Sequence, residues 1–368
     1  MLHWWLSLTL WIALACGLEH HYQDSSQFKS WLQQLETTDT VEVVHSTLPP
    51  TSTNATFLVL CQNSDVYDML ETIHNFQERF PYAYDWTFLN DEPFTKDFIY
   101  LVGSRFSAGR ISFGTIPKEH WGWPEHIDVD LAHLSFEQLS GFPYGSSESY
   151  RHMCRWFSGF FYHHPLLSRY QYYWRVEPDV RLTCDIPRDL FKYMADHDVW
   201  YGYALTIFEY RETIRSLWST FKEFLATEPA VENNLPLLPM VQNDDEYQSY
   251  NLCHFWNNFE IANLDLFRND KYQRLFDHLD QSGGFYYERW GDAPIHTLAV
   301  VLALNQSQVH WFDEIGYSHR PYHQCPQNDH KWIQNRCVCD PDDDFSFGSY
   351  SCTPHFLKVT GQKVDFGE

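Results

Sequence analysis

Tyr-Tyr-Trp-Arg-Val-Glu-Pro-Asp-Val, residues 172–180, is the stretch around which this chain of 368 residues is organised. It opens with five residues of high strand preference or aromatic bulk, and the run breaks at Glu177-Pro178. Proline cannot donate to a sheet, so we predict a buried strand that stops at Glu177. The crevice at the carboxyl ends of such strands binds ligands, and Glu177 and Asp179 there could hold a divalent cation with its phosphates. The alternative, favoured by these nine residues alone, is a turn carrying a solvated acid.

Strands and helices alternate on the N-terminal side of this stretch. Residues 55–61 predict a buried strand, and residues 84–89 predict a second one. A helix capped by Ser64 is predicted between them, and its apolar stripe is Val66, Met69, Leu70, Ile73 and Phe76. This order predicts a βαβ unit with a parallel sheet, and hence an α/β fold. The glycine-rich dinucleotide and Walker loops are missing after the first strand.

The alternation continues beyond the central stretch. The predicted elements are a short helix opened by Asp185 and Pro187, a strand at 200–207, a helix at 214–225, a surface loop at 233–249, a helix at 270–281 ended by Gly283-Gly284, and a strand at 309–312. We therefore expect one large α/β domain with additions.

The charge balance excludes one class of partner. The chain has 25 basic and 49 acidic residues, a formal net charge of -24, and no basic run. Binding to a nucleic-acid backbone requires clustered Lys and Arg, so we expect no nucleic-acid partner. Aromatic residues make up 18% of the chain, which suits stacking on sugars and bases but equally suits the filling of a core.

The N-terminus predicts entry into the secretory pathway. Residues 4–18 are apolar and uncharged, but the run is shorter than the roughly 20 residues that span a bilayer comfortably. A cleaved signal and a signal-anchor that holds the chain in the membrane both remain open. We expect residues 1–18 to be this leader, 19–53 a short lumenal stem, and 54–368 the folded domain. Asn54 and Asn305 begin glycosylation acceptor triplets.

Cysteine usage agrees with an oxidising compartment. Four of the nine cysteines crowd into the last fifth of the chain, in a region rich in Pro, Asp and Gly. The spacing of Cys337 and Cys339 is too tight for the usual zinc pair. We therefore predict a C-terminal segment stapled by disulfides, with the connectivity left open.

Three further stretches contain residues suited to chemistry. In Asn258-Phe259-Glu260-Ile261-Ala262, the alternation of a strand turns Glu260 away from its two apolar neighbours. Glu260 then lies either on the solvated face of an edge strand or in a cleft. In a cleft, its carboxylate could serve as base, nucleophile or cation stabiliser. Asp292 occupies an N-cap position, and capping alone would explain it. His319 follows the last strand, where it is either an exposed loop histidine or a metal ligand.

A helical stretch at 150–157 places Tyr150, Arg151 and Arg155 about one turn apart. Arginine suits bidentate contact with phosphate, although a solvent-facing helix arginine is the commoner outcome.

Together these stretches resemble the fungal α-1,2-mannosyltransferases of glycosyltransferase family 15. The matching segments, in family order, are Tyr-Arg-His-Met-Cys-Arg at 150–155, Tyr-Trp-Arg-Val-Glu-Pro at 173–178, Tyr-Asn-Leu-Cys-His-Phe-Trp at 250–256, Asn-Phe-Glu-Ile-Ala at 258–262, Tyr-Glu-Arg-Trp-Gly-Asp-Ala-Pro at 287–294, and Ile-Gly-Tyr at 315–317 with His319. The resemblance covers roughly residues 55–352, and runs of this length are far more specific than a short motif.

The resemblance implies a Golgi enzyme of the nucleotide-sugar transferase A (GT-A) fold: a single Rossmann-like mixed sheet flanked by helices, with a disulfide-rich C-terminal segment. Such an enzyme moves mannose from GDP-mannose onto a mannosylated glycoprotein or oligomannoside with retention of configuration, using Mn²⁺, in protein glycosylation and cell-wall mannan synthesis. A type II membrane protein or a cleaved, lumenal protein would fit.

The resemblance also implies roles for individual residues. It implies that Glu177 and His319 hold the metal, and that Glu260 is the nucleophile or the stabiliser of an oxocarbenium-like transition state. It further implies that Tyr150 lies near the donor. The residues that it implies to contact donor and acceptor are Arg155, Arg175 and Asp292. The chemistry is consistent, because a metal offsets the diphosphate charge and a carboxylate stabilises a developing sugar cation.

The chain departs from the family in two places. Cys61-Gln62-Asn63 stands where members carry Arg-Asn, so a cationic contact near the nucleotide is missing, and the leader starts without a basic tail. The alternatives are mannosylphosphate transfer from the same donor and a catalytically silent carbohydrate-binding secretory protein. A retaining glycosidase is disfavoured, because the sequence offers no second carboxylate for Glu260 apart from those of the metal site.

Overall fold

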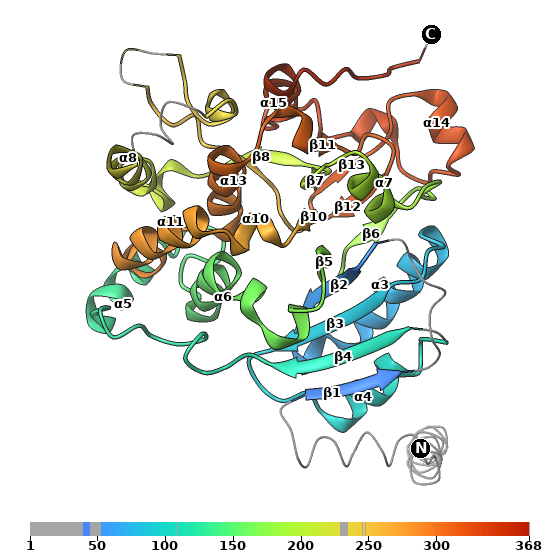
Figure 1. The fold of residues 1–368 in the computed structure, drawn as a ribbon, viewed down its shortest axis with the longest axis horizontal. Helices are drawn as coiled ribbons and strands as arrows, with labels where there is room; N and C mark the ends of the chain where they lie inside the picture. Colours follow the sequence, from blue (N-terminus) through green and yellow to red (C-terminus); the bar gives the residue numbers. More distant parts are fainter. Residues whose placement is uncertain are drawn as a thin grey trace, which may run out of the picture.

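The computed structural model describes residues 40–44, 53–107, 109–228, 235–244, 246 and 248–367. A mixed sheet of eight strands runs through the molecule in the order β1-β4-β3-β2-β5-β10-β7-β11 (Figure 1). Its strands are β1 (Thr40–Val44), β2 (Ala55–Leu60), β3 (Asp85–Asn90), β4 (Arg110–Thr115), β5 (Tyr172–Val176), β7 (Tyr201–Tyr203), β10 (Glu260–Asn263) and β11 (Val309–Trp311). The α/β class predicted from the βαβ order is confirmed.

The direction of the strands changes at the centre of the sheet. β2 runs parallel to both β3 and β5, as the βαβ order predicts, and β3 runs parallel to β4. β10 is antiparallel to both of its neighbours, β5 and β7. The carboxyl end of β5 therefore lies beside the amino end of β10, and Arg175 pairs in register with Glu260.

Helices cover both faces of the sheet, so the central strands β5 and β10 bury the side chains of both their faces. Trp174 packs in one core with side chains of α3, and Tyr173 packs in the other core with side chains of α6 and α13. The helices are α3 (Val66–Arg79), α4 (Lys96–Gly103), α5 (Val129–Gln138), α6 (Glu148–Gly159), α7 (Leu190–Asp196), α8 (Leu217–Thr227), α10 (Asp265–Arg268), α11 (Asp270–Gln281), α12 (Gly284–Tyr287), α13 (Asp292–Ala303), α14 (Asp329–Gln334) and α15 (Thr353–Thr360).

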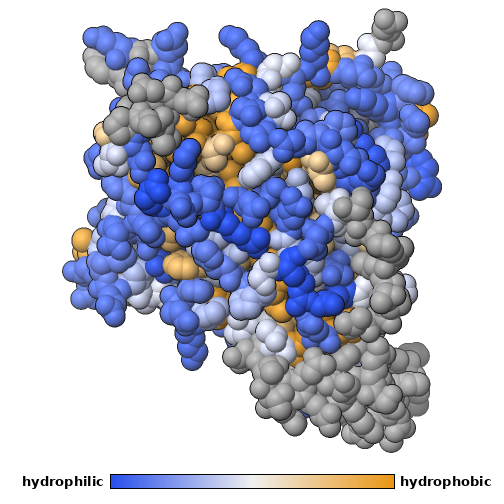
Figure 2. All heavy atoms as spheres, in the orientation of Figure 1, coloured by the Kyte–Doolittle hydropathy of each residue, from blue (hydrophilic) through white to orange (hydrophobic). Residues whose placement is uncertain are grey.

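Two small sheets flank the large one. β12 (Tyr317–His319) lies between β13 (Tyr322–Gln324) and β6 (Arg181–Leu182), and β8 (Thr206–Phe208) pairs with β9 (Cys253–Phe255). The surface visible in Figure 2 is largely hydrophilic, as the charge composition leads one to expect.

Several predicted boundaries are confirmed. β5 ends at Val176, immediately before Glu177, and α11 spans residues 270–281 as predicted. α3 begins at Val66 with Asp65 in the N-cap position, so the cap predicted at Ser64 was wrong, and Ser64 lies in the short 3-10 turn before the helix.

Other boundaries were wrong. The strand predicted at 200–207 is two strands, because the chain leaves the large sheet after Tyr203 and pairs with β9. The short helix begins at Leu190, where the Asp189 side chain accepts a hydrogen bond from the Lys192 amide, rather than at 185–187. Within the expected surface loop, the described segment 235–244 buries four apolar side chains, Leu235, Leu237, Met240 and Val241.

The expected stem contributes to the sheet. Residues 40–44 form β1, which pairs antiparallel with β4 at the edge, so the folded unit begins before residue 54. The leader at 4–18 lies outside the described residues. Within the described residues, none of the helices is long and apolar enough to cross a membrane.

The disulfide prediction is confirmed, and the structure supplies the pairing. Cys184 bonds to Cys337, Cys253 to Cys352, and Cys325 to Cys339. The first ties the C-terminal segment to Cys184, just after β6, and the second ties it to β9, whereas Cys61 and Cys154 are free and buried.

Candidate functional site

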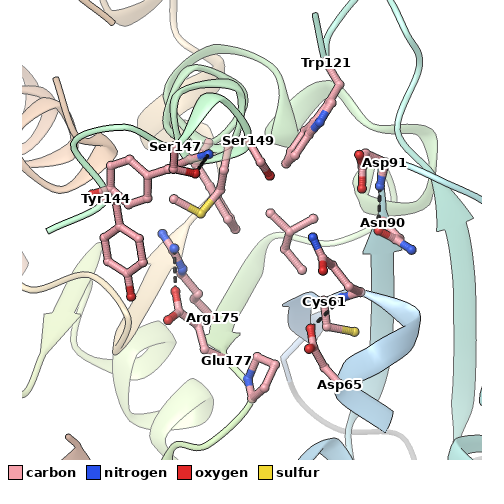
Figure 3. Close-up of a pocket in the computed structure, with 16 residues that line it drawn as sticks. Cys61, Asp65, Asn90, Asp91, Trp121, Tyr144, Ser147, Ser149, Arg175 and Glu177 are labelled. Atoms are coloured by element: carbon pink, nitrogen blue, oxygen red, sulfur yellow. Dashed lines mark hydrogen bonds and ion pairs between the residues drawn. The ribbon is translucent and has the colours of Figure 1, made fainter. Parts of the chain in front are cut away.

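A cavity of about 290 Å³ opens at the carboxyl ends of β2, β3 and β5, beside the start of α6. In Figure 3, Asn90 and Asp91 lie across this cavity from Tyr144 and Arg175. Its lining residues are Leu60, Cys61, Gln62, Asp65, Asn90, Asp91, Trp121, Tyr144, Ser147, Ser149, Tyr150, Met153, Phe157, Arg175, Glu177 and Pro178. Three carboxylates and one guanidinium are among them, so the lining as described has an excess of negative charge.

The predicted pair of metal ligands meets beside this cavity, which Glu177 lines and His319 does not. Glu177 follows β5 and His319 ends β12, and Glu177 Oε2 lies 3.7 Å from His319 Nε2. This separation exceeds a hydrogen bond. Metal–ligand distances of about 2.0–2.2 Å allow two ligand atoms of one ion to lie up to about 4.4 Å apart, so the pair fits a small divalent cation. Asp179, by contrast, is exposed and is not among the lining residues.

Arg175 links the two acidic groups next to this pair. Its guanidinium donates to Glu177 Oε1 at 2.6 Å and to Asp292 Oδ2 at 2.5 Å, and it lies 3.8 Å from the centre of the Phe157 ring. Burial lowers the pKa of Arg175, but the charges of Glu177 and Asp292 outweigh burial and raise it above its usual value. Arg175 therefore holds one oxygen of Glu177 and leaves the other facing His319.

Asp292 does more than a helix cap would require. It is the first residue of α13, where Gly291 occupies the N-cap position without a side-chain bond, so the capping interpretation was wrong. Its carboxylate instead accepts from Arg175 and from Asn257 Nδ2 at 2.8 Å. Burial acts to raise the pKa of Asp292, but the charges of Arg175 and His296 outweigh it and leave the pKa below its usual value.

Glu260 lies deeper than either sequence interpretation expected. It is fully buried at the start of β10, a central strand, and it is not among the residues that line the cavity. Its carboxylate accepts from Tyr173 Oη and from Tyr201 Oη, the latter at 2.6 Å. His296 Nδ1 lies 2.8 Å from Oε2, the oxygen that Tyr201 also contacts, and 3.1 Å from Oε1.

His296 joins Glu260 in a buried ion pair. Its Nε2 donates to the Phe157 carbonyl at 2.9 Å, and its Nδ1 faces the Glu260 carboxylate, so both ring nitrogens have an acceptor and the imidazolium is the form that satisfies both. Burial lowers the pKa of His296, but the charge and hydrogen bond of Glu260 raise it above the usual value overall. Asn257, which also bonds Asp292, lies 3.4 Å from the same ring.

A second buried ion pair lies beside Tyr150 and was missed from the sequence. Arg289 donates to Glu209 Oε1 at 2.9 Å and to Tyr150 Oη at 3.2 Å. Tyr150 lines the cavity, so this pair lies next to it. A signal existed for His296, which stands four residues after Asp292 and so on the same helix face. Glu209 directly follows β8, and the sequence-based prediction had treated β7 and β8 as one strand.

The structure does not bring Arg155 to the cavity. Its guanidinium forms a buried bidentate pair with Asp280 of α11, at 2.7 and 2.8 Å, and its face lies against Phe160. The Nε and Nη2 edge, which could otherwise clamp a phosphate, is thereby used between α6 and α11. Arg155 joins two helices, whereas Tyr150, Arg175, Glu177, His319 and Asp292 form one connected site.

The described residues contain one cluster of three or more close potential metal ligands, Cys184, Cys337 and Cys339. All three cysteines are in disulfides, so their sulfur atoms are not thiolate ligands. The pair formed by Glu177 and His319 is therefore the better candidate for a cation.

Comparison with known proteins gives the site a chemical context. Residues 19–361 match a family model described as glycolipid 2-alpha-mannosyltransferase. The chain is 49% identical to the probable mannosyltransferase MNT3 of Candida albicans over 92% of its length and 89% of that protein. It is 48% identical to the alpha-1,2 mannosyltransferase KTR1 of Saccharomyces cerevisiae, over 83% and 78% of the two chains.

A solved structure extends the comparison to the fold. Core-mannan synthase A of Aspergillus fumigatus, crystallised in a Mn/GDP form, superposes with a TM-score of 0.79 at 36% identity, covering 87% of this chain and 88% of that one. The GT-A fold implied by the sequence resemblance is thereby confirmed.

Proposed function

Since the chain belongs to the glycolipid 2-alpha-mannosyltransferase family, we propose that it transfers mannose from GDP-mannose to a mannoside acceptor in α-1,2 linkage, with retention of configuration. It is a glycosyltransferase, and its cofactor is Mn²⁺. The observation that carries the proposal is the pair formed by Glu177 and His319 beside an acidic cavity. An acidic cavity repels a diphosphate unless a cation is held there, and this pair supplies a place for one.

Each described residue of the site has a role in this proposal. Glu177 and His319 would hold the manganese ion, which neutralises the diphosphate and stabilises GDP as it leaves. Arg175 orients Glu177 and neutralises Asp292. Tyr150 presents its ring to the donor cavity, and its hydroxyl is held by Arg289.

Glu260 acts through its charge and its hydrogen bonds. A nucleophile has to reach the anomeric carbon of the sugar, and the carboxylate of Glu260 is enclosed by Tyr173, Tyr201 and His296. We therefore assign Glu260 to positioning: it holds His296, whose charge faces Asp292, while Asn257 donates to the same Asp292 carboxylate. Its negative charge also favours a cation that develops on the sugar.

The place of action follows from the disulfides and the family. Three disulfides require an oxidising compartment, and the chain acts in the secretory pathway. We propose the Golgi lumen and a type II arrangement in which residues 4–18 anchor the chain, with a cleaved leader as the alternative.

The test measures mannose transfer by the lumenal part, from about residue 20 onward, with GDP-mannose and an α-mannoside, in the presence of manganese or of a chelator. We expect manganese-dependent transfer that Glu177→Ala and His319→Ala each reduce at least about 100-fold. Glu71→Ala is the matched control, since Glu71 lies on the exposed side of α3 and pairs only with the exposed Arg181. GDP affinity, measured by calorimetry with manganese, should fall in the two ligand variants alone.

Product analysis separates the remaining candidates. A product that resists mild acid and yields to an α-1,2-specific mannosidase supports the proposal, whereas an acid-labile phosphodiester supports mannosylphosphate transfer. Folded wild-type protein that neither binds GDP nor transfers mannose would refute enzymatic function and support a silent carbohydrate-binding protein.

A further inference from the structure

Exposed tyrosines continue the site away from the donor cavity. Tyr144 and Tyr150 stack with ring centres 4.7 Å apart and an angle of 6° between the rings. Tyr210 contacts Phe142 at 5.4 Å between centres, and it remains 39% exposed. Aromatic side chains at a surface normally bury their rings, so rings left open beside a site offer a stacking face.

Tyr350 faces the same region from the C-terminal segment. Its ring lies 5.8 Å from that of Phe208, the last residue of β8, and it is 38% exposed. Glu209 and Tyr210 follow Phe208 directly. Burial raises the pKa of the Tyr350 hydroxyl, and the charges of Tyr210 and Glu209 add to the rise.

The segment that carries Tyr350 is held firmly against β8 and β9. Cys352 bonds to Cys253 of β9, and Thr353 Oγ1 lies 2.8 Å from Thr206 Oγ1 of β8. Ser351 Oγ donates to the carbonyl of Ser346 at 2.8 Å, closing the loop. The ring of Tyr350 is therefore placed by covalent and buried polar contacts, which limits the entropy lost when a ligand covers it.

These tyrosines connect to the donor cavity through one ion pair. Arg289 binds Glu209 on one side and the Tyr150 hydroxyl on the other. Tyr150 lines the cavity, and Tyr210 follows Glu209 in the chain. Tyr210 therefore lies one residue from a side chain that is joined, through Arg289, to the Tyr150 hydroxyl at the donor cavity.

We propose that Tyr210 and Tyr350 form an acceptor platform that binds the second sugar of a neutral oligomannoside. The proposal rests on the mannosyltransferase function proposed above and adds that acceptors of two or more sugars are preferred to a single mannose. Sugar rings present C–H faces that pack on aromatic rings, and their hydroxyls donate to carboxylates such as Glu209 and the exposed Glu212. An acceptor that carries phosphate would meet these carboxylates unfavourably.

The test compares methyl α-mannoside with α-1,2-mannobiose as acceptors for the lumenal part of the chain. We expect the wild-type protein to show a KM for mannobiose about 3- to 10-fold lower than for the monosaccharide, with similar kcat. Tyr350→Ala should raise the KM for mannobiose to the monosaccharide value and leave kcat within about twofold, whereas Tyr350→Phe should keep the preference.

Phe347→Ala is the matched control. Phe347 is 37% exposed and lies three residues before Tyr350, but its ring packs on Trp311 and Phe366. The Phe347→Ala substitution should leave the preference for mannobiose over the monosaccharide unchanged. Equal KM values for the two acceptors in wild-type protein, or an equal effect of Tyr350→Ala on both acceptors, would overturn the platform.

Direct binding separates this proposal from the one on which it rests. Ligand-observed NMR with mannobiose and manganese-GDP needs no turnover, and it should detect contact with wild-type protein that Tyr350→Ala loses. Mannobiose that binds both proteins alike contradicts the platform even if transfer proceeds. If the wild-type protein neither binds GDP nor transfers mannose, but its binding of mannobiose still depends on Tyr350, the transferase function alone would be refuted.

Discussion

Removal of the Glu260 carboxylate should destabilise the folded protein and also lower its transfer activity. Glu260→Ala leaves His296 as an uncompensated cation in the core and takes an acceptor from the hydroxyls of Tyr173 and Tyr201. Breaking a buried ion pair by removing one partner costs about 3–5 kcal/mol. Glu260→Gln retains an acceptor for the tyrosines but loses the charge, so a smaller loss of about 1.5–3 kcal/mol is expected.

The assay is urea unfolding of the lumenal part at pH 6, followed by the fluorescence of its tryptophans, with the transfer rate measured on the same preparations. Glu71→Ala serves as the surface control and should stay within about 0.5 kcal/mol of wild type. A Glu260→Ala protein of wild-type stability that has lost transfer would refute the buried ion pair, because the carboxylate would then act in the cleft rather than in the core.

A double-mutant cycle with His296→Gln isolates the pair itself. Coupling of at least about 1 kcal/mol is expected between the two positions, because they share hydrogen bonds. The pKa of His296 is raised in the folded state, so the stability it contributes is complete below its unfolded value of about 6.5 and is lost as the pH rises through the folded value. Wild-type protein should therefore lose more stability than His296→Gln between pH 6.5 and 9.

Three further outcomes are expected. Gln62→Arg should tighten GDP binding by about 1.5–3 kcal/mol in low salt, measured by calorimetry, with the gain shrinking as salt is added; an unchanged affinity would mean that residue 62 does not face the phosphates. Cys352→Ser, which opens a loop of 99 residues, should lower the free energy of unfolding by about 4 kcal/mol, and an unchanged urea midpoint would contradict this. The pKa of Asp292 is lowered in the folded state, so its contribution is present above about pH 4 and is lost at lower pH; acid unfolding of Asp292→Asn should lack this component, and identical acid profiles would argue against the pairing with Arg175.

Much of the fold could be predicted from local pattern. Proline after Glu177 ends a strand whatever surrounds it, and the 3.6-residue spacing of 270–281 specifies a helix with one apolar face. Cysteine usage predicted disulfides without their partners, because pairing depends on which segments meet in space. Long matching segments identified the family before any coordinates, and with it Glu177 and His319 as the candidate metal ligands.

Tertiary structure decided the partners of the charged groups. Alternation along 258–262 predicts that Glu260 and its apolar neighbours point to opposite faces of a strand. It does not predict that β10 lies between β5 and β7 with helices over both faces of the sheet. The family resemblance assigns both Arg155 and Arg175 to contacts with donor or acceptor, yet one meets Asp280 and the other meets Glu177 and Asp292. Local periodicity determines which way a side chain points along its own element, whereas the charge it meets comes from an element often more than 100 residues away, and only the packing of the whole chain brings the two together.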